Sequence, residues 1–324
     1  MDFLSPIDIQ KINGESNKNA LPIGRLATKK IQETLSFLTV EKNVQKTRDL
    51  ITFMEGTMLQ PYNPSVIGAG KDMGAFDKRT LTIEVGMLLS KADEPERYRD
   101  TWLATLSELE LKPEQLPFSK WYLETLAIIA EQDLVQLPFL GKKGAGTTVV
   151  DICDGYHEIV NDEITATNIS SAKGNLYDAS AYTAANIGDQ LKEQYLKFPD
   201  QTQQRGGILA YVPWNMRELY REFLINKYQY QVADGDVKMD YLDGTDKKVK
   251  LNWLAAMGSS QRVYMTTAGI LKYGLSSPDI YGKITVFNPN GNPYLVQATK
   301  KVPIGFQIQT LDSRAFNSND ILTA

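Results

Sequence analysis

The sequence has little of the chemistry that enzymes and metal proteins commonly use. Its 324 residues include one cysteine, Cys153, and one histidine, His157. A single thiol forms no intrachain disulfide and no cysteine cluster around a metal ion. Catalysis of the Ser-His-Asp or Cys-His kind would have to use His157, and no nucleophile-elbow motif accompanies it. We therefore predict a protein that is not an enzyme and holds no metal and no cofactor.

An excess of positive charge is also missing, as is any long hydrophobic run. Lys and Arg number 35 against 39 Asp and Glu, which gives a net charge of −4. Tight nucleic-acid binding needs many cations on one surface, and a protein bound to a membrane surface needs a basic amphipathic helix. Residues 1–19 lack the basic region and apolar run of a secretory signal, and no transmembrane span is visible. The expectation is a soluble protein that is not exported.

Two glycine clusters match a phosphate-binding loop only in part. Residues 141–148, GKKGAGTT, have suitably spaced glycines but no lysine after Gly146. Residues 67–72, IGAGKD, contain Gly-Lys but lack the following Ser or Thr. A phosphate loop needs that lysine to reach the terminal phosphates. Neither segment therefore predicts nucleotide binding.

The sole histidine lies in residues 149–160, where apolar residues recur at helical spacing. Acidic residues surround it, but only Asp154, three residues before, shares its face of the helix. A metal ligand or a general base would need more partners on that face. We predict that His157 is a surface residue of an amphipathic helix.

Residues 117–137 form the most apolar helix that the sequence predicts. Pro117 suits a first helical turn, and Pro138 closes the other end. Polar residues form one narrow stripe, on which Lys120 and Glu124 have the spacing of an ion pair. A helix that is apolar around most of its circumference is normally buried on several sides. Its predicted core residues are Trp121, Leu126 and Ile129.

The remaining pattern predicts an α+β protein, because helices and strands are segregated along the chain. Helices are predicted at residues 41–55, from Pro95 through Leu109, at 186–196 and from an N-cap pair formed by Asn215 and Glu218. Strands are predicted at residues 80–85, 207–212, 262–266, 283–287, 294–298 and 304–310. Residues 56–79 form a long loop with four glycines, and loops of this length are usually functional or disordered.

In this order of elements the chain resembles the major capsid protein of tailed bacteriophages, which has the Hong Kong 97 fold. Encapsulin shells share that fold. The local sequence is similar to capsid proteins of phages of Bacteroidetes-type hosts, in segments spread over most of the chain: residues 79–104, 115–134, 146–160, 208–223 and 252–274.

The resemblance implies a domain organisation. Residues 1–40 would be an N-terminal arm, and residues 41–145 a peripheral domain with an extended loop at about 56–91 and a spine helix at about 117–137. Residues 146–275 would be mainly an axial domain, and residues 276–324 strands that return to the peripheral domain. Within the extended loop, the resemblance implies contacts with a neighbouring subunit through Pro61, Tyr62, Pro64, Gly68, Gly70, Lys71, Gly74 and Phe76.

The implied function is mechanical. Copies of the chain would assemble as pentamers and hexamers into an icosahedral shell around double-stranded phage DNA, which the inner face would contact without sequence specificity. Further partners would be a portal protein, with scaffolding or decoration proteins as additional candidates, and no membrane. The protein would be part of the virion capsid and would assemble in the cytoplasm of the bacterial host.

Two other functions remain open at this point. An encapsulin-like compartment would share the fold but enclose enzymes, and a groove for a cargo peptide would distinguish it. A carboxylate-dependent hydrolase needs only two acidic side chains that the fold brings together, so the sequence does not exclude it. Such an enzyme would be a monomer or a small oligomer rather than a shell.

Overall fold

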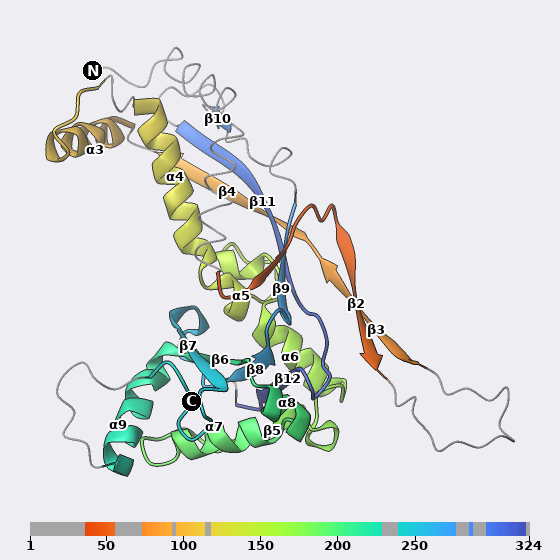
Figure 1. Cartoon of the computed structure of the whole chain (residues 1–324). Coiled ribbons are helices and arrows are strands. Elements are labelled where there is room, and N and C mark those ends of the chain that lie inside the picture. Colours follow the sequence, from red (N-terminus) through yellow and green to blue (C-terminus); the bar gives the residue numbers. More distant parts are fainter. Residues whose placement is uncertain are drawn as a thin grey trace, which may run out of the picture. The chain divides into compact units, whose positions relative to one another are not determined.

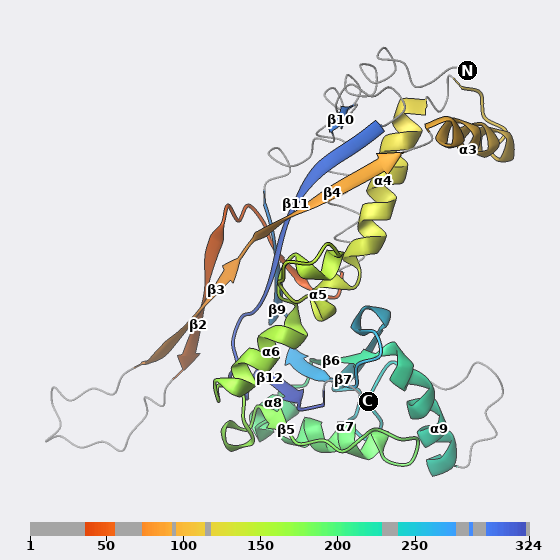
Figure 2. The same ribbon diagram turned by 180° about the vertical axis from the view of Figure 1, so that it is seen from behind.

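The computed structural model describes residues 36–55, 73–92, 95–113, 118–228, 239–276, 285–287 and 296–321. The chain divides into two compact units, each built from separate stretches of sequence (Figure 1 and Figure 2). Unit 1 comprises residues 1–46, 83–154 and 274–305, and unit 2 comprises residues 47–82, 155–273 and 306–324. Among the described residues, no helix is both long enough and apolar enough to span a bilayer.

Unit 1 combines a sheet with a long helix. The described strands of this sheet follow the order β1 (Thr39–Glu41), β9 (Leu271–Leu275), β11 (Val296–Ile308) and β10 (Thr285–Phe287), and β4 (Glu84–Ala92) also pairs with β11. Helix α4 (Phe118–Leu134) lies along β4 and β11 (Figure 1 and Figure 2). Helix α3 (Pro95–Glu108) precedes α4, and the short helix α5 (Leu137–Leu140) follows it.

An aromatic cluster joins α3 and α4. Tyr122 packs edge-on against Tyr98 of α3, with ring centroids 5.9 Å apart, and stacks on Phe118 at 6.0 Å. Trp121 is partly buried against this cluster, and Leu126 is buried with 5% of its surface exposed. Three aromatic residues among the first five of α4 therefore anchor it at one end, and Leu126 continues the contact along the helix.

The helix differs from the prediction in two respects. Pro138 does not close it, because the chain turns after Leu134 and Pro138 lies in the first turn of α5, where a missing N–H costs nothing. Ile129, which was predicted to be core, is 46% exposed in the subunit. The prediction for Ile129 is wrong for the isolated chain, because none of the residues that the structure describes covers that side of α4 fully. The Lys120–Glu124 pair is present at 4.0 Å.

We expect Leu126→Ala and Ile129→Ala to differ in their effect on the unassembled subunit. Leu126→Ala removes buried methyl groups and leaves a cavity, so it should lower the free energy of unfolding by about 2–5 kcal/mol. Ile129→Ala should cost no more than about 1.5 kcal/mol, since much of that side chain already contacts water. Urea unfolding followed by circular dichroism measures both. Equal costs would mean that unit 1 covers Ile129 after all.

Unit 2 is built on a mixed five-stranded sheet within the described residues. Its order is β5 (Leu176–Tyr177), β12 (Phe316–Asn319), β8 (Tyr264–Thr267), β6 (Ile208–Pro213) and β7 (Val249–Leu254). The pairs β6–β7 and β5–β12 are parallel, and β8 is antiparallel to both of its neighbours. The helices of this unit are α6 (Tyr156–Thr165), α7 (Ile187–Leu196), α8 (Asp200–Arg205) and α9 (Arg217–Tyr228).

The core of unit 2 lies where α7 and α9 pack against the central strands. Ile187 and Leu191 of α7 and Tyr220 and Phe223 of α9 are buried there, together with Ile208 of β6. The sequence predicted α7, β6 and the apolar face of α9 correctly. The helix after β6 does not start at the predicted N-cap Asn215, because residues 214–216 form a separate 3₁₀ turn and α9 begins at Arg217.

Close contact between α7 and α9 depends on Gly188. A Cβ added at Gly188 would lie 2.0 Å from the nearest ring atom of Phe223. We expect Gly188→Ala to destabilise the subunit by about 1–3 kcal/mol through overpacking, although alanine is the better helix former by about 1 kcal/mol. Adding Phe223→Leu should recover part of this loss, which denaturant titration of the single and double variants measures. A more stable Gly188→Ala variant would contradict this packing.

Several predicted elements take another form. Residues 41–55 were predicted as one helix, but they begin at the last residue of β1 and contain the strand β2 (Thr47–Glu55). Two predicted strands, at 294–298 and 304–310, are largely one strand, β11. The predicted helix at 149–160 is a 3₁₀ turn at Val149–Asp151 followed by α6, which starts only after Gly155. The last strand, β12, pairs with β8 within unit 2.

Candidate functional site

His157 is buried, so its predicted position on a helix surface is wrong. Its Nδ1 shares a hydrogen bond with the hydroxyl of Tyr264 on β8. Arg262, also buried, donates to the backbone oxygen of His157 at 3.2 Å and to Asn161 at 2.8 Å. A second Arg262 nitrogen donates to the backbone oxygen of Asp320 at 3.2 Å. These bonds connect α6, β8 and the C-terminal segment, so His157 has a structural role in unit 2.

The surroundings of His157 favour its neutral form. Burial and, next to it, the charge of Arg262 lower the pKa of His157 to about 3. The folded chain therefore keeps His157 neutral at pH values where the unfolded chain protonates it, near pH 6.5. Neutral His157 therefore stabilises the folded state above pH 6.5, and this contribution to stability is lost as the pH falls toward the folded pKa.

We expect this linkage to be measurable because no other histidine competes. Between pH 6 and pH 5 the free energy of unfolding should fall with a slope approaching 1.4 kcal/mol per pH unit, the value for about one proton. His157→Asn should be less stable at pH 7 but should lose most of this slope. Urea unfolding of the unassembled subunit at pH 7, 6 and 5 measures the difference between the two chains. Parallel curves would show that His157 titrates normally in the folded state.

Cys153 is buried as well and has no nucleophilic character. Burial, followed by the nearby carboxylates of Asp154 and Glu84, raises the pKa of its thiol to about 12. Among the residues that the structure describes, no group of three or more His, Cys, Asp or Glu side chains is placed to hold a metal ion. The surface that stands out is instead a β ribbon in unit 2.

This ribbon is the two-stranded hairpin of β2 and β3 (Gly74–Thr82). The strands pair in antiparallel register, with Phe53 opposite Phe76 and Ile51 opposite Lys78. Directly opposed residues lie on the same face, and successive residues alternate between faces. Ile51, Phe53, Phe76 and Lys78 therefore share one face, which we call the outer face.

The outer face is apolar and open to solvent. Ile51 is 59% exposed, Phe53 42% and Phe76 72%. The rings of Phe53 and Phe76 contact each other, with centroids 5.1 Å apart. A hairpin with three exposed large apolar side chains on one face is unusual for a solitary soluble protein, because such a patch normally marks a contact with another molecule.

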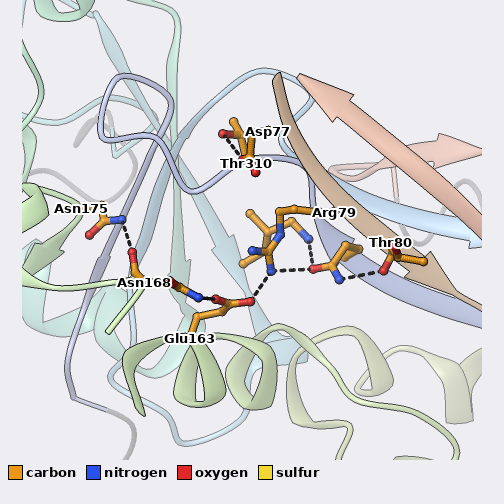
Figure 3. A network of polar contacts seen from close by, with 9 residues as sticks. Asp77, Arg79, Thr80, Glu163, Asn168, Asn175 and Thr310 are labelled. Carbon is orange, nitrogen blue, oxygen red and sulfur yellow. Dashed lines mark hydrogen bonds and ion pairs between the residues drawn. The ribbon is translucent and has the colours of Figure 1, made fainter. Parts of the chain in front are cut away.

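The opposite face of the hairpin is anchored to the body of unit 2. Arg79 donates through Nη2 to Glu163 on α6 at 2.6 Å and to Gln307 on β11 at 3.1 Å. Gln307 donates in return to the backbone oxygen of Thr80 at 3.0 Å. Figure 3 shows Glu163 pointing up from α6 toward Arg79 on the strand. We call Arg79, Glu163 and Gln307 the anchor.

Farther along β3, a further hydrogen bond joins the hairpin to the body of unit 2. Thr310 donates to Asp77 at 3.1 Å. Beside this bond lies a cavity of about 560 Å³, lined by the hairpin, by Asn168, Lys173 and Asn175, and by residues 311–313. The hairpin is therefore held firmly at its base, near Arg79, and borders open space beyond it.

The structure places only part of the predicted contact set. Gly74 and Phe76 lie in β3, where Gly74 opens the strand and Phe76 contributes to the outer face. The predicted 56–79 loop is therefore a strand from Gly74 onward. Six predicted contact residues lie outside the described residues: Pro61, Tyr62, Pro64, Gly68, Gly70 and Lys71.

Sequence reasoning missed Ile51, Phe53 and the anchor. The segment TRDLITFME alternates β-branched and aromatic residues with others, which is the signal of a strand, but Val44, Ile51 and Met54 also fit a helical face. No local sequence pattern indicates the anchor, because Arg79 and Glu163 are 84 residues apart in sequence.

A second open surface lies in unit 1, between α4 and β4. Met87 and Leu89 of β4 face Leu126 and Ile129 of α4 across a groove of about 480 Å³. Met87 and Leu89 are exposed, like Ile129. Each unit thus presents apolar side chains that the isolated subunit leaves uncovered.

Solved structures resemble this arrangement over nearly its whole length. A chain of the satellite phage P4 procapsid matches with a TM-score of 0.62 at 10% identity, covering 91% of this chain and 89% of that one. The capsid of an empty GTA particle matches with a TM-score of 0.58 at 11% identity, covering 90% and 96%. The chain has the Hong Kong 97 capsid fold.

A third capsid agrees with the first two. That of Myoviridae phage XM1 matches with a TM-score of 0.52 at 10% identity and covers 91% of this chain and 92% of that one. No protein-family model matches the sequence, and no curated protein matches it. At such low identity the likeness establishes the fold, which confirms the predicted fold class.

Proposed function

We propose that this chain is a major capsid protein that assembles into the closed head shell of a tailed bacteriophage. The observation that carries the proposal is the apolar outer face of the β2–β3 hairpin, which unit 2 leaves exposed. In a chain with a capsid fold, such a face is explained if a neighbouring copy covers it. The capsid structures that resemble the chain along about nine-tenths of its length support this assignment.

The contact is of a kind that builds closed assemblies. In the proposed shell, the outer face of one copy meets a different surface on the next copy. Head-to-tail contacts of this type generate rings when the rotation closes, and rings are the units of a shell. Phe53 and Phe76 are suited to be energetic centres of the contact, because large aromatic side chains dominate protein interfaces.

Domain roles follow from the same proposal. Unit 1, with α4 as its spine helix, takes the peripheral role, and unit 2 takes the axial role. Strands β2 and β3, with the segment that connects them, are the extended loop, and residues 1–40 are the N-terminal arm. Contacts of Pro61, Tyr62, Pro64, Gly68, Gly70 and Lys71 with a neighbour remain part of the proposal.

The proposed partners are those of a phage head. The shell encloses double-stranded DNA, and a net charge of −4 allows that DNA to be packed without tight adhesion. A portal protein occupies one vertex, and scaffolding or decoration proteins are further candidates. Assembly takes place in the cytoplasm of a bacterial host, for which the local sequence resemblance suggests the Bacteroidetes type.

We expect the purified chain to form particles that negative-stain electron microscopy shows as closed shells or as pentameric and hexameric rings. Phe53→Ser combined with Phe76→Ser should reduce particle yield by roughly tenfold or more, since each lost aromatic contact costs over about 1 kcal/mol and recurs in every subunit. Stability of the subunit should change little, because both side chains are exposed.

Phe76→Tyr is the matched control, because it keeps the ring and its contact area. It should assemble nearly as the unaltered chain does, as measured by light scattering after size-exclusion chromatography. A chain that stays monomeric across salt and protein concentration would speak against a shell. Shells of normal yield from the double serine variant would show that the outer face is not the contact surface.

A further inference from the structure

The anchor places a carboxylate where a helix does not favour one. Glu163 lies in the last turn of α6, and that turn contains no basic residue. The C-terminal end of a helix carries partial negative charge, so an acidic side chain there is unfavourable by itself. Departures from such local rules tend to occur at functional positions. Arg79 supplies, from β3, the positive charge that α6 lacks.

The pair is largely removed from solvent. The side chains of Arg79 and Glu163 are only 12% and 18% exposed. Burial alone would raise the pKa of Glu163, but hydrogen bonds from Arg79 and Asn168 outweigh it and lower that pKa below its usual value. A partly buried charge that loses its partner is costly, because it cannot recover its full hydration. Separation of the hairpin from α6 is therefore opposed more strongly than a surface ion pair would allow.

A second layer of residues holds Glu163 in place. Asn168 donates to the other carboxylate oxygen of Glu163 at 2.7 Å. Its neighbour Thr167 has a φ of 60°, in the left-handed region that a branched residue rarely adopts. Asn175 in turn donates to the backbone oxygen of Asn168 at 3.1 Å, as Figure 3 shows. The turn after α6 is thus shaped to orient the carboxylate that receives Arg79.

The hairpin depends on this anchor for its direction. A ribbon of two strands is at best marginally stable without further packing. Beside the anchor lies the cavity of about 560 Å³, so the hairpin meets little resistance there. The buried side chains of Leu50 and Leu81 hold the base of the hairpin. Its angle to the rest of unit 2 is further set by Arg79, by the return bond from Gln307 and by the Asp77–Thr310 bond.

We propose that Arg79 and Glu163 form an assembly latch, which fixes the hairpin in the direction in which its outer face can meet a neighbouring copy. The proposal rests on the shell function proposed above and adds to it a means of control. With the latch closed, the direction of the outer face is set before two subunits meet, so binding loses less conformational freedom. With the latch open, the subunit stays folded, but its hairpin samples directions that do not fit the neighbour.

The same hairpin offers a matched control. Lys78 and Asp49 form an ion pair at 2.8 Å on the outer face, with side chains 61% and 45% exposed. This pair links β2 to β3 and does not reach the body of unit 2. An effect that arises from the latch should follow Arg79 and Glu163, whereas a general effect of charge on the hairpin should follow Lys78 and Asp49 equally.

The test compares Glu163→Gln with Asp49→Asn in the full chain. Hydrogen exchange is measured on the unassembled subunit at neutral pH. Glu163→Gln should accelerate exchange of amides in β2 and β3 by roughly tenfold, the effect of weakening one charge-assisted hydrogen bond, while β6 and β8 keep their protection. Particle yield should fall severalfold. Asp49→Asn should change neither quantity by more than about twofold.

Exchange in the hairpin that is equally fast in the unaltered chain and in Glu163→Gln would overturn the latch. Glu163→Gln could instead lose protection throughout unit 2. In that case the test uses the double variant Arg79→Glu with Glu163→Arg, which swaps the two charges and keeps an ion pair at the same place. Recovered hairpin protection and particle yield would support the latch, and no recovery would overturn it. Failure of the unaltered chain to form particles would count against the shell alone, because exchange tests the latch in single subunits.

Discussion

A ribbon of two strands cannot cover both of its own faces, and the architecture of unit 2 follows from that constraint. One face of the β2–β3 hairpin is tied down through Arg79, and the other carries Ile51, Phe53 and Phe76 into solvent. On that first face the polar bonds of Arg79 act together with the buried side chains of Leu50 and Leu81. The exposed apolar side chains lie on the outer face, where another molecule can bury them.

The two units are interleaved along the chain, and this limits how they can form. The sequence passes from one unit to the other after residues 46, 82, 154, 273 and 305. Neither unit is a continuous stretch that could fold as it is synthesised. Pairings such as β4 with β11 join residues more than 200 positions apart, as the partners Val85 and Pro303 illustrate. Contacts between distant residues slow folding, because loop closure must come first.

The sequence predicted correctly those elements whose hydrophobic periodicity fits only one type of secondary structure. Helix α7, strand β6 and the buried face of α9 follow directly from spacing. Residues 47–55 satisfied both a helical and an alternating pattern, and only pairing with β3 decides between them. The burial of His157 depends on Tyr264, 107 residues away, and the Arg79–Gln307 bond spans 228 residues. No single-sequence pattern contains such pairings, so the anchor had to come from the structure.

The buried thiol has a practical consequence for work on this protein. Cys153 is the one cysteine in the sequence, and burial keeps it protonated and out of reach of reagents. Maleimide dyes and spin labels react with exposed thiolates. A cysteine introduced at an exposed hairpin position would therefore be labelled almost alone. The natural sequence already provides the silent background that fluorescence energy transfer or electron paramagnetic resonance requires, without prior mutation of the core.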